Sequence, residues 1–259
     1  MIPIKTAAEI EKMRASCKLA SRILQDLSAM LCPGISTKDV DEAAARLMED
    51  AGCKSAFLGY RQFPGTICIS VNEEVVHGIG GPRRIQYCDI VKLDVGVILN
   101  GFVGDTAATV PVGIVGDDVQ RLLTATEDAL QKGIEKVREG RRLSDVCAAI
   151  QDEVESNGFS IVREFVGHGV GRRLHEEPQI PNYRTAGTTA KLRAGMTLAI
   201  EPMVNLGGAA VKVLDDDWTV VTADHSPSAH FEHTVLVTKG EPEILTWREK
   251  TSSKLKARS

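Results

Sequence analysis

The chain has 259 residues, with 31 basic and 35 acidic side chains and a formal net charge of −4. A chain of this length can bury a core without disulfide or metal cross-links, and 43% hydrophobic with 25% charged residues is a globular rather than a disordered composition. The acidic balance argues against nucleic acid or an anionic membrane as the main partner, because binding phosphates needs a positive surface.

The six cysteines are spread along the chain and form no C-x-x-C pair. This argues against a zinc knuckle, a redox pair or a disulfide framework. The first residues lack the apolar run of a signal peptide, and no stretch of about 18 apolar residues occurs. We therefore expect a cytoplasmic protein with reduced cysteines and no membrane span.

Apolar residues at steps of three and four predict amphipathic helices in two pairs. The second helix is expected to begin behind Ser36 or Thr37 as N-cap, and the fourth behind Ser144. The predicted helices span residues 6–32, 36–52, 118–140 and 144–158. Beyond Gly158 the chain is rich in glycine, proline and β-branched residues, which predicts strands and turns.

Six identities at one fixed spacing relate the two helix pairs. Adding 106 to the first number of each pair gives the second: Gly34 and Gly140, Asp39 and Asp145, Val40 and Val146, Ala43 and Ala149, Glu49 and Glu155, Gly52 and Gly158. Shared caps and glycines explain some of the matches, but a single offset favours two related halves. We expect one domain over 1–259, with halves at about 1–115 and 116–245 and a flexible, solvated basic tail at 246–259.

The segment 89–106 predicts a β-hairpin that places two aspartates together. Asn100-Gly101 between β-rich runs is a strong turn signal, and with that turn the numbers of paired residues sum to 201. Asp94 then faces Ala107 and Asp105 faces Gly96, so the two carboxylates are diagonal neighbours on one face.

Two carboxylates on an apolar hairpin repel each other and are costly to desolvate. The face could be exposed, the pair could share a proton, or it could hold a cation. The apolar neighbours of Asp94 disfavour simple exposure, and Gly96 leaves room for something bulky opposite Asp105. A metal site is slightly favoured on this evidence.

Two histidines, His77 and His168, stand beside glycines, and His175 follows the same glycine-rich segment as His168. His168 lies in Gly167-His168-Gly169, where a phosphate-binding loop is the rival interpretation, but no helix is expected to follow. His175 begins H-E-E-P and lacks the second histidine of H-E-x-x-H, and His77 precedes a glycine turn. A lone histidine is more often structural, so a functional role is favoured only modestly.

Two glutamates lie in apolar strand-like segments. Glu201 ends one such run, where it could also be a charge that protects a sheet edge. Glu232 is expected inside another strand, on one face with His230 and Thr234. Carboxylates with an imidazole suit Mn, Fe(II), Co or Zn, and four carboxylates balance two divalent ions.

In chain order, Asp94, Asp105, His168, Glu201 and Glu232 match the five metal ligands of the methionine aminopeptidases. The flanking segments are also similar: S-V-N-E-E-V-V-H-G at 70–78, G-H-G-V-G at 167–171, H-E-E-P at 175–178, A-I-E-P at 199–202 and F-E-H-T at 231–234. The resemblance extends to about Trp247 and is closest to the short, bacterial-style type I form, with neither an N-terminal zinc-binding extension nor a long insertion.

The resemblance implies the α/β (α+β) pita-bread fold of creatinase and the aminopeptidases, a curved antiparallel sheet covered by two helix pairs with pseudo-two-fold symmetry. It also implies two divalent ions, of Co, Mn, Fe(II) or Zn. Asp94 would chelate one ion, His168 and Glu201 the other, and Asp105 and Glu232 both.

The same resemblance implies removal of the initiator methionine from nascent proteins and peptides, with a small second residue preferred. An activated water would be the nucleophile, and Glu201 would pass its proton to the leaving amine. His77 and His175 would bind the scissile amide and the oxyanion. A monomer is expected, with no nucleic-acid or membrane partner; docking of the basic tail at the ribosome is the alternative to simple solvation.

The implied pocket for the methionine side chain is apolar and contains a thiol, which suits a polarizable thioether. Its residues are Tyr60, Phe63, Cys68, Leu174 and Trp218. The chain departs from common family residues at Phe57 (often Cys), Phe63 (often Tyr), Leu174 (often Phe) and His230 (often Gln). These departures leave the pocket shape open.

Three other functions are possible for a chain with this fold. A proline-specific peptidase of the same fold would carry a substantial extra N-terminal domain. A pita-bread binding protein without catalysis, or a creatinase-like hydrolase without metal, would lack ligands that are all present here. The metallo-aminopeptidase is therefore the favoured prediction.

Overall fold

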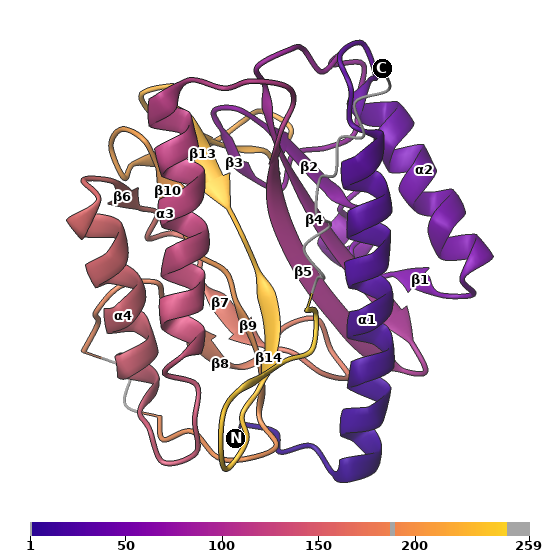
Figure 1. Ribbon diagram of the computed structural model, residues 1–259. Helices are drawn as coiled ribbons and strands as arrows, with labels where there is room; N and C mark the ends of the chain where they lie inside the picture. Colours follow the sequence, from indigo (N-terminus) through magenta and orange to yellow (C-terminus); the bar gives the residue numbers. More distant parts are fainter. Residues whose placement is uncertain (1, 187–189, 248–259) are drawn as a thin grey trace, which may run out of the picture.

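The computed structural model describes residues 2–186 and 190–247 (Figure 1). The helices are α1 (Ala7–Met30), α2 (Thr37–Asp50), the short 3-10 helix η1 (Tyr60–Gln62), α3 (Asp117–Ile134) and α4 (Leu143–Ser156). The strands of the first half are β1 (Lys54–Ser55), β2 (Cys68–Val71), β3 (Glu74–Val76), β4 (Ile90–Leu99) and β5 (Phe102–Pro111).

The strands after α4 are short and follow one another closely, as expected for the part of the chain beyond Gly158. They are β6 (Ser160–Ile161), β7 (Gly167–Gly169), β8 (Glu176–Ile180), β9 (Thr197–Ile200), β10 (Met203–Asn205), β11 (Val211–Val213), β12 (Val220–Thr222), β13 (Ser228–His230), β14 (His233–Leu236) and β15 (Glu243–Ile244). The glycine-rich segment around His168 leads into strand β8 and not into a helix, so the phosphate-loop interpretation is excluded.

The two helix pairs cover one face of the strands, with α1 over β4 and β5 and α3 over the strands of the second half (Figure 1). Two principal sheets lie beneath them: β1, β4 and β2 with β5 paired to β4, and a five-stranded sheet in the order β15-β14-β9-β7-β8. Buried side chains of helices and strands from both halves form one continuous main core. The mixed helix and antiparallel sheet agree with the predicted fold class.

The helix starts follow the predicted capping only in part. Ser36 caps α2 in a capping box, as expected. The fourth helix, however, begins at Leu143 behind Arg142 and not behind Ser144, because Asp145 accepts a hydrogen bond from the Arg142 N–H. The third helix ends at Ile134, not at Gly140.

The early end of α3 has a tertiary cause. The N–H groups of Glu139 and Gly140 donate to the carbonyls of Thr238 and Leu192, so this segment is hydrogen-bonded to chain that is distant in sequence and not to its own helix. Periodicity in the sequence does not contain this information.

The spacing of 106 residues is visible in the structure. Both ends of α2 and α4 differ by that offset, since α2 is Thr37–Asp50 and α4 is Leu143–Ser156. The matched glycines also share left-handed backbones, with φ of 97° at Gly34 and 86° at Gly140. These matches support the division into two related halves.

Helix α1 lies directly on strand β5 at Gly104. A Cβ atom at this position would lie 2.4 Å from the backbone carbonyl of Ser16 and 2.5 Å from the Cys17 nitrogen. Since these are backbone atoms of a helix, they cannot move aside without shifting α1. Gly104 therefore sets the distance between the helix and the hairpin that carries the two aspartates.

We expect Gly104→Ala to lower the free energy of unfolding by about 3 kcal/mol, the upper range for overpacking a core. The measurement is urea denaturation followed by circular dichroism. Gly240→Ala is the control, because a Cβ there meets nothing within 4 Å. Equal stability of the two variants would contradict this account of the α1–β5 contact.

Across the part of the chain that the structure describes, no helix is long and apolar enough to span a bilayer. Of the expected basic tail at 246–259, only Thr246 and Trp247 belong to the described residues; Arg248, Lys250, Lys254, Lys256 and Arg258 lie outside them.

Candidate metal centre and substrate pocket

The β4–β5 hairpin has the predicted register. Leu99 pairs with Phe102, Asp94 with Ala107, and Asp105 with Gly96. The space expected beside Gly96 is filled by the ring of Phe57, because a Cβ at 96 would lie 2.4 Å from that ring. The hairpin thus presents both carboxylates on one face, as the turn and the pairing predicted.

The other acidic and imidazole groups come from the second half of the chain. His168 lies on β7, and Glu201 follows the last residue of β9. The prediction that Glu232 lies within a strand is wrong: β13 ends at His230 and β14 begins at His233. Between these strands the chain crosses to β5, where the Glu232 N–H donates to the Ala107 carbonyl.

Hydrogen bonds across this crossing fix Glu232 beside Asp105. The Thr106 hydroxyl donates to the Glu232 carbonyl at 2.9 Å, and the Thr234 hydroxyl donates to the Asp105 carbonyl at 2.8 Å. Both contacts are buried and join the two halves of the chain. The site is therefore assembled at the junction of the halves.

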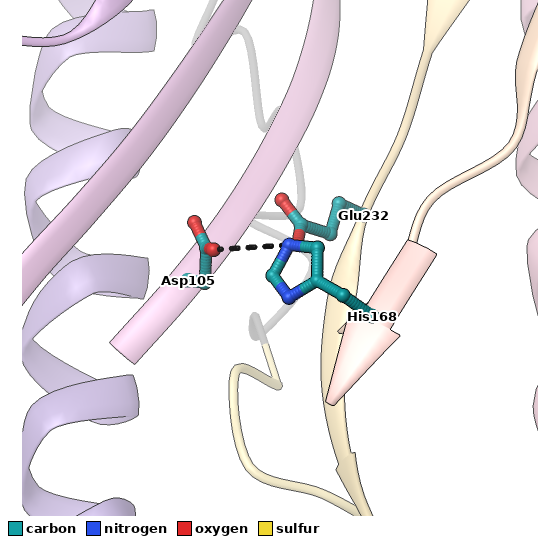
Figure 2. Close-up of side chains that lie close together, drawn as sticks. All are labelled: Asp105, His168 and Glu232. Atoms are coloured by element: carbon teal, nitrogen blue, oxygen red, sulfur yellow. Dashed lines mark ion pairs between the residues drawn. The ribbon is translucent and has the colours of Figure 1, made fainter. Parts of the chain in front are cut away.

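Asp105, His168 and Glu232 point toward one another (Figure 2), and one ligand-type atom of each lies within 4.8 Å of the others. The Nε2 atom of His168 is 3.9 Å from Asp105 Oδ2 and 3.4 Å from Glu201 Oε1. Four of the five predicted metal ligands are thus connected by these distances. Asp94 joins them through its diagonal position next to Asp105.

Burial dominates the electrostatics of this cluster. It raises the pKa of Asp94 to about 7 and the pKa of Glu201 to about 8. Burial and the neighbouring carboxylates raise the pKa of Asp105 and of Glu232 well above its ordinary value. Ionising all four carboxyl groups in this buried site costs free energy. A bound cation would offset that cost by stabilising their negative charges.

The histidine of the cluster is in the protonation state that binds a metal ion. Burial lowers the pKa of His168 to about 3, so its ring is neutral. Its Nδ1 lies 3.0 Å from the Gly169 carbonyl, and only an Nδ1–H can donate to that oxygen. The lone pair is therefore on Nε2, which faces the carboxylates.

The residues present fit divalent cations. Among the described residues, the buried oxygens Asp94 Oδ1, Asp105 Oδ1 and Glu232 Oε1 have no hydrogen-bond partner. Buried polar atoms without a partner are rare in folded proteins, and these three come from the β4–β5 hairpin and from the segment between β13 and β14. Four carboxylates and one imidazole are a donor set for Mn, Fe(II), Co or Zn.

A cavity of about 250 Å³ opens onto this cluster, and all twelve predicted site residues line it. They are Tyr60, Phe63, Cys68, His77, Asp94, Asp105, His168, Leu174, His175, Glu201, Trp218 and Glu232. Sequence reasoning did not name five further lining residues, which are Arg61, Val76, Phe165, Val166 and Met203. Their only signal is proximity: each is within three residues of a predicted site residue.

Part of the cavity lining is aromatic. The rings of Phe63 and Trp218 meet edge to face, with centroids 5.1 Å apart. Burial and the nearby carboxylates raise the pKa of the Cys68 thiol well above its ordinary value, so this cysteine contributes an apolar surface and not a thiolate. Leu174, 8% exposed, completes an apolar pocket beside the acidic cluster.

Two further histidines lie between the apolar pocket and the carboxylates. Burial lowers the pKa of His77 to about 4, and the His77 ring packs edge to face on Phe165 at 5.3 Å. His175 Nδ1 is hydrogen-bonded to the Tyr60 hydroxyl at 2.7 Å, which leaves Nε2 to carry a proton when the hydroxyl donates. Both rings are neutral hydrogen-bonding groups that line the cavity beside the candidate metal centre.

The sequence profile of "Metallopeptidase family M24" matches residues 11–239. The chain belongs to metallopeptidase family M24. Two curated relatives are methionine aminopeptidases. Methionine aminopeptidase 1 of Bacillus subtilis is 48% identical over 246 residues, which cover 95% of this chain and 99% of that protein. The methionine aminopeptidase of Escherichia coli is 43% identical, with coverage of 96% and 95%.

Solved structures agree with this placement. The methionine aminopeptidase of Thermotoga maritima superposes with a TM-score of 0.93 at 46% identity and covers 96% of this chain and 100% of its own. A prolidase from Pyrococcus furiosus has a TM-score of 0.77 at 23% identity and covers 95% of this chain and 66% of its own, a likeness of fold alone. The pita-bread fold expected from the sequence is thereby confirmed, and the M24 protein is a metallo-aminopeptidase.

Proposed function

We propose that this M24 protein removes the N-terminal methionine from nascent proteins and peptides, with preference for a small second residue. The observation that supports the substrate is a single cavity in which an acidic cluster adjoins an aromatic pocket with a thiol. A flexible thioether suits such a pocket, and the alternatives of an Xaa-Pro peptidase or an inactive binding protein are not favoured by the relatives.

The metal centre proposed is dinuclear. Asp94 would hold one ion, His168 and Glu201 the other, and Asp105 and Glu232 both. The four negative charges of the carboxylates would then balance the four positive charges of two divalent ions. When bound, such ions lower the pKa of water from about 15.7 toward about 7 and polarise a carbonyl. Co, Mn, Fe(II) and Zn all accept this ligand set.

The remaining steps belong to side chains of the chain itself. Glu201 accepts the proton of the attacking water and transfers it to the leaving amine nitrogen as the carbon–nitrogen bond breaks. His77 and His175 are placed to donate hydrogen bonds to the scissile amide and to the developing oxyanion. Tyr60, Phe63, Cys68, Leu174 and Trp218 hold the methionine side chain and exclude water from it.

The proposal is tested by metal restoration. The purified protein is stripped with a chelator and assayed on a Met-Ala-Ser peptide while Mn²⁺, Fe²⁺, Co²⁺ or Zn²⁺ is added in turn. Release of free methionine that depends on the ion is the expected result, with a Met-Leu-Ser peptide cleaved more slowly. Equal rates on the two peptides would overturn the preference for a small second residue, and no release with any ion would overturn the activity.

His77→Ala is expected to lower kcat by about 10²–10⁴-fold while leaving divalent metal bound, because His77 contacts substrate and not metal. The control is His225→Ala: His225 is exposed, and its backbone φ of 59° matches the 61° of His77, so both changes impose the same backbone cost. Steady-state kinetics and metal analysis of both variants are the measurements. A His77→Ala enzyme with the wild-type rate would show that His77 has another role.

Partner and location are also proposals. The substrate would be the exposed N-terminus of a nascent polypeptide, met in the cytoplasm by a monomer. Transient contact with the ribosome would place the enzyme at that substrate.

A further inference from the structure

His230, the last residue of β13, is a buried imidazole that the proposed chemistry does not use. Its exposed fraction is 1%, and neither Nδ1 nor Nε2 has a hydrogen-bond partner among the described residues. Because buried polar atoms are nearly always hydrogen-bonded, two bare nitrogens in one ring indicate a partner that the ring is placed to meet.

The backbone of His230 is fixed on both sides. Its N–H donates to Thr109 Oγ1 at 2.8 Å, and the Thr109 hydroxyl donates to the His230 carbonyl at 2.8 Å. His230 also pairs with Met203 between β13 and β10. These contacts fix the point from which the ring projects, and the ring lies in the protein interior.

Glu201 is the group that the His230 ring faces. His230 Nε2 is 3.6 Å from Glu201 Oε2, while His168 Nε2 is 3.4 Å from the other oxygen, Oε1. The carboxylate thus lies between two imidazoles, one at each oxygen. A shift of about half an ångström would bring the His230–Glu201 pair within hydrogen-bond distance.

Only one of these imidazoles can donate to the carboxylate in its neutral form. The Nδ1–H of His168 is committed to the Gly169 carbonyl, so its Nε2 carries a lone pair. His230 has no such commitment and can carry its proton on Nε2. Donors behind a metal-binding carboxylate fix which oxygen faces the ion.

We infer that His230 is a positioning residue that donates its Nε2–H to Glu201 Oε2 and thereby aims Oε1 at the metal centre. The inference rests on the proposed function, in which Glu201 is a metal ligand and the proton carrier. A glutamine amide is also an N–H donor, so glutamine at this position could make the same hydrogen bond.

The test compares Mn²⁺ binding to metal-free wild-type protein, His230→Gln and His230→Asn by titration calorimetry. The two amides have the same chemistry but differ in reach by one methylene group. We expect His230→Asn to bind Mn²⁺ about 10–100-fold more weakly, and His230→Gln to stay within about threefold of wild type, the scale for outer-sphere donors of metal ligands. Equal affinity of the two variants would overturn the inference.

A double-mutant cycle shows whether the effect passes through Glu201. In the Glu201→Gln background, His230→Asn is expected to change Mn²⁺ affinity by less than about twofold, because the carboxylate that it positions is gone. A full 10–100-fold loss in that background would assign His230 some other role.

Thermal denaturation of the metal-free variants separates positioning from packing, since a positioning role predicts unequal Mn²⁺ affinities at equal melting temperatures. An affinity loss that follows a lower melting temperature would overturn the inference. Methionine release by the Mn²⁺-loaded wild type is measured in parallel. Its failure with metal bound would overturn the proposed function and leave the role of His230 standing.

Discussion

His168→Ala is expected to abolish methionine release and to weaken divalent metal binding by more than about 100-fold. The scale is set by outer-sphere partners of metal ligands, whose loss alone costs about 10–100-fold. The His168 ring is neutral, carries its lone pair on Nε2, and lies 3.4 Å from Glu201 and 3.9 Å from Asp105. It is the imidazole of the acidic cluster, and without it only the four carboxylates remain to bind metal.

His175→Ala provides a matched comparison. The rings of His168 and His175 have centroids only 4.3 Å apart, yet His175 is bonded to the Tyr60 hydroxyl and not to a carboxylate. The His175 variant should keep its metal and lose turnover by about 10²–10³-fold, the scale for an oxyanion donor. Metal analysis after gel filtration, together with kinetics on a Met-Ala-Ser peptide, distinguishes the two. If both variants kept their metal, His168 would not be a ligand.

Part of this site could be predicted from the sequence alone, and the rest could not. The hairpin register followed from Asn100-Gly101 and the pairing rule, because a two-residue turn fixes every partner along both strands. That register alone placed Asp94 and Asp105 on one face. The grouping of His168, Glu201 and Glu232 with them came from the family resemblance and not from the spacing of these residues.

Other features depend on contacts that are distant in sequence. The interruption at Glu232 arises because its N–H bonds to Ala107 on β5, and the end of α3 because Gly140 bonds to Leu192. Likewise, the Phe57 ring packs against Gly96, and the sequence around neither residue predicts this contact. Local patterns predict the elements, whereas these terminations and contacts depend on the tertiary structure.

In the metal-free protein, stability is expected to fall as the pH rises from 6.5 to 8.5, by about 1.4 kcal/mol per pH unit for each proton that the folded state retains and the unfolded chain has lost. The cause is the buried carboxyl cluster: burial raises the pKa of Asp94 to about 7 and that of Glu201 to about 8, and the pKa values of Asp105 and Glu232 are raised well above the ordinary range. In the unfolded chain these groups have lost their protons above pH 6. The folded state therefore binds more protons, and rising pH favours unfolding.

The buried histidines and one buried lysine also affect the sign of the pH dependence of stability. The pKa values of His168, His77 and His230 are lowered by burial to about 3, 4 and 4, so their contribution to stability is lost below the unfolded value of 6.5 and not within this window. Burial lowers the pKa of Lys92 to about 7, which opposes the carboxyls by at most one proton. The raised pKa values of Asp105 and Glu232 act in the same direction as those of Asp94 and Glu201, so four carboxyls oppose one lysine and the net slope is expected to be negative.

Saturating Mn²⁺ should remove this loss of stability, because bound carboxylates are ionised in the folded state and no longer hold protons there. Urea denaturation at pH 6.5, 7.5 and 8.5, with either EDTA or Mn²⁺, measures both curves, and calorimetry in buffers of different ionisation enthalpy counts the protons that Mn²⁺ releases. The Asp105→Asn, Glu232→Gln double variant is the control, since it removes two of the four carboxyls whose pKa values are raised. A metal-free protein as stable at pH 8.5 as at pH 6.5 would show that the four carboxyls ionise freely, and the electrostatic reason for a dinuclear centre would fall with it.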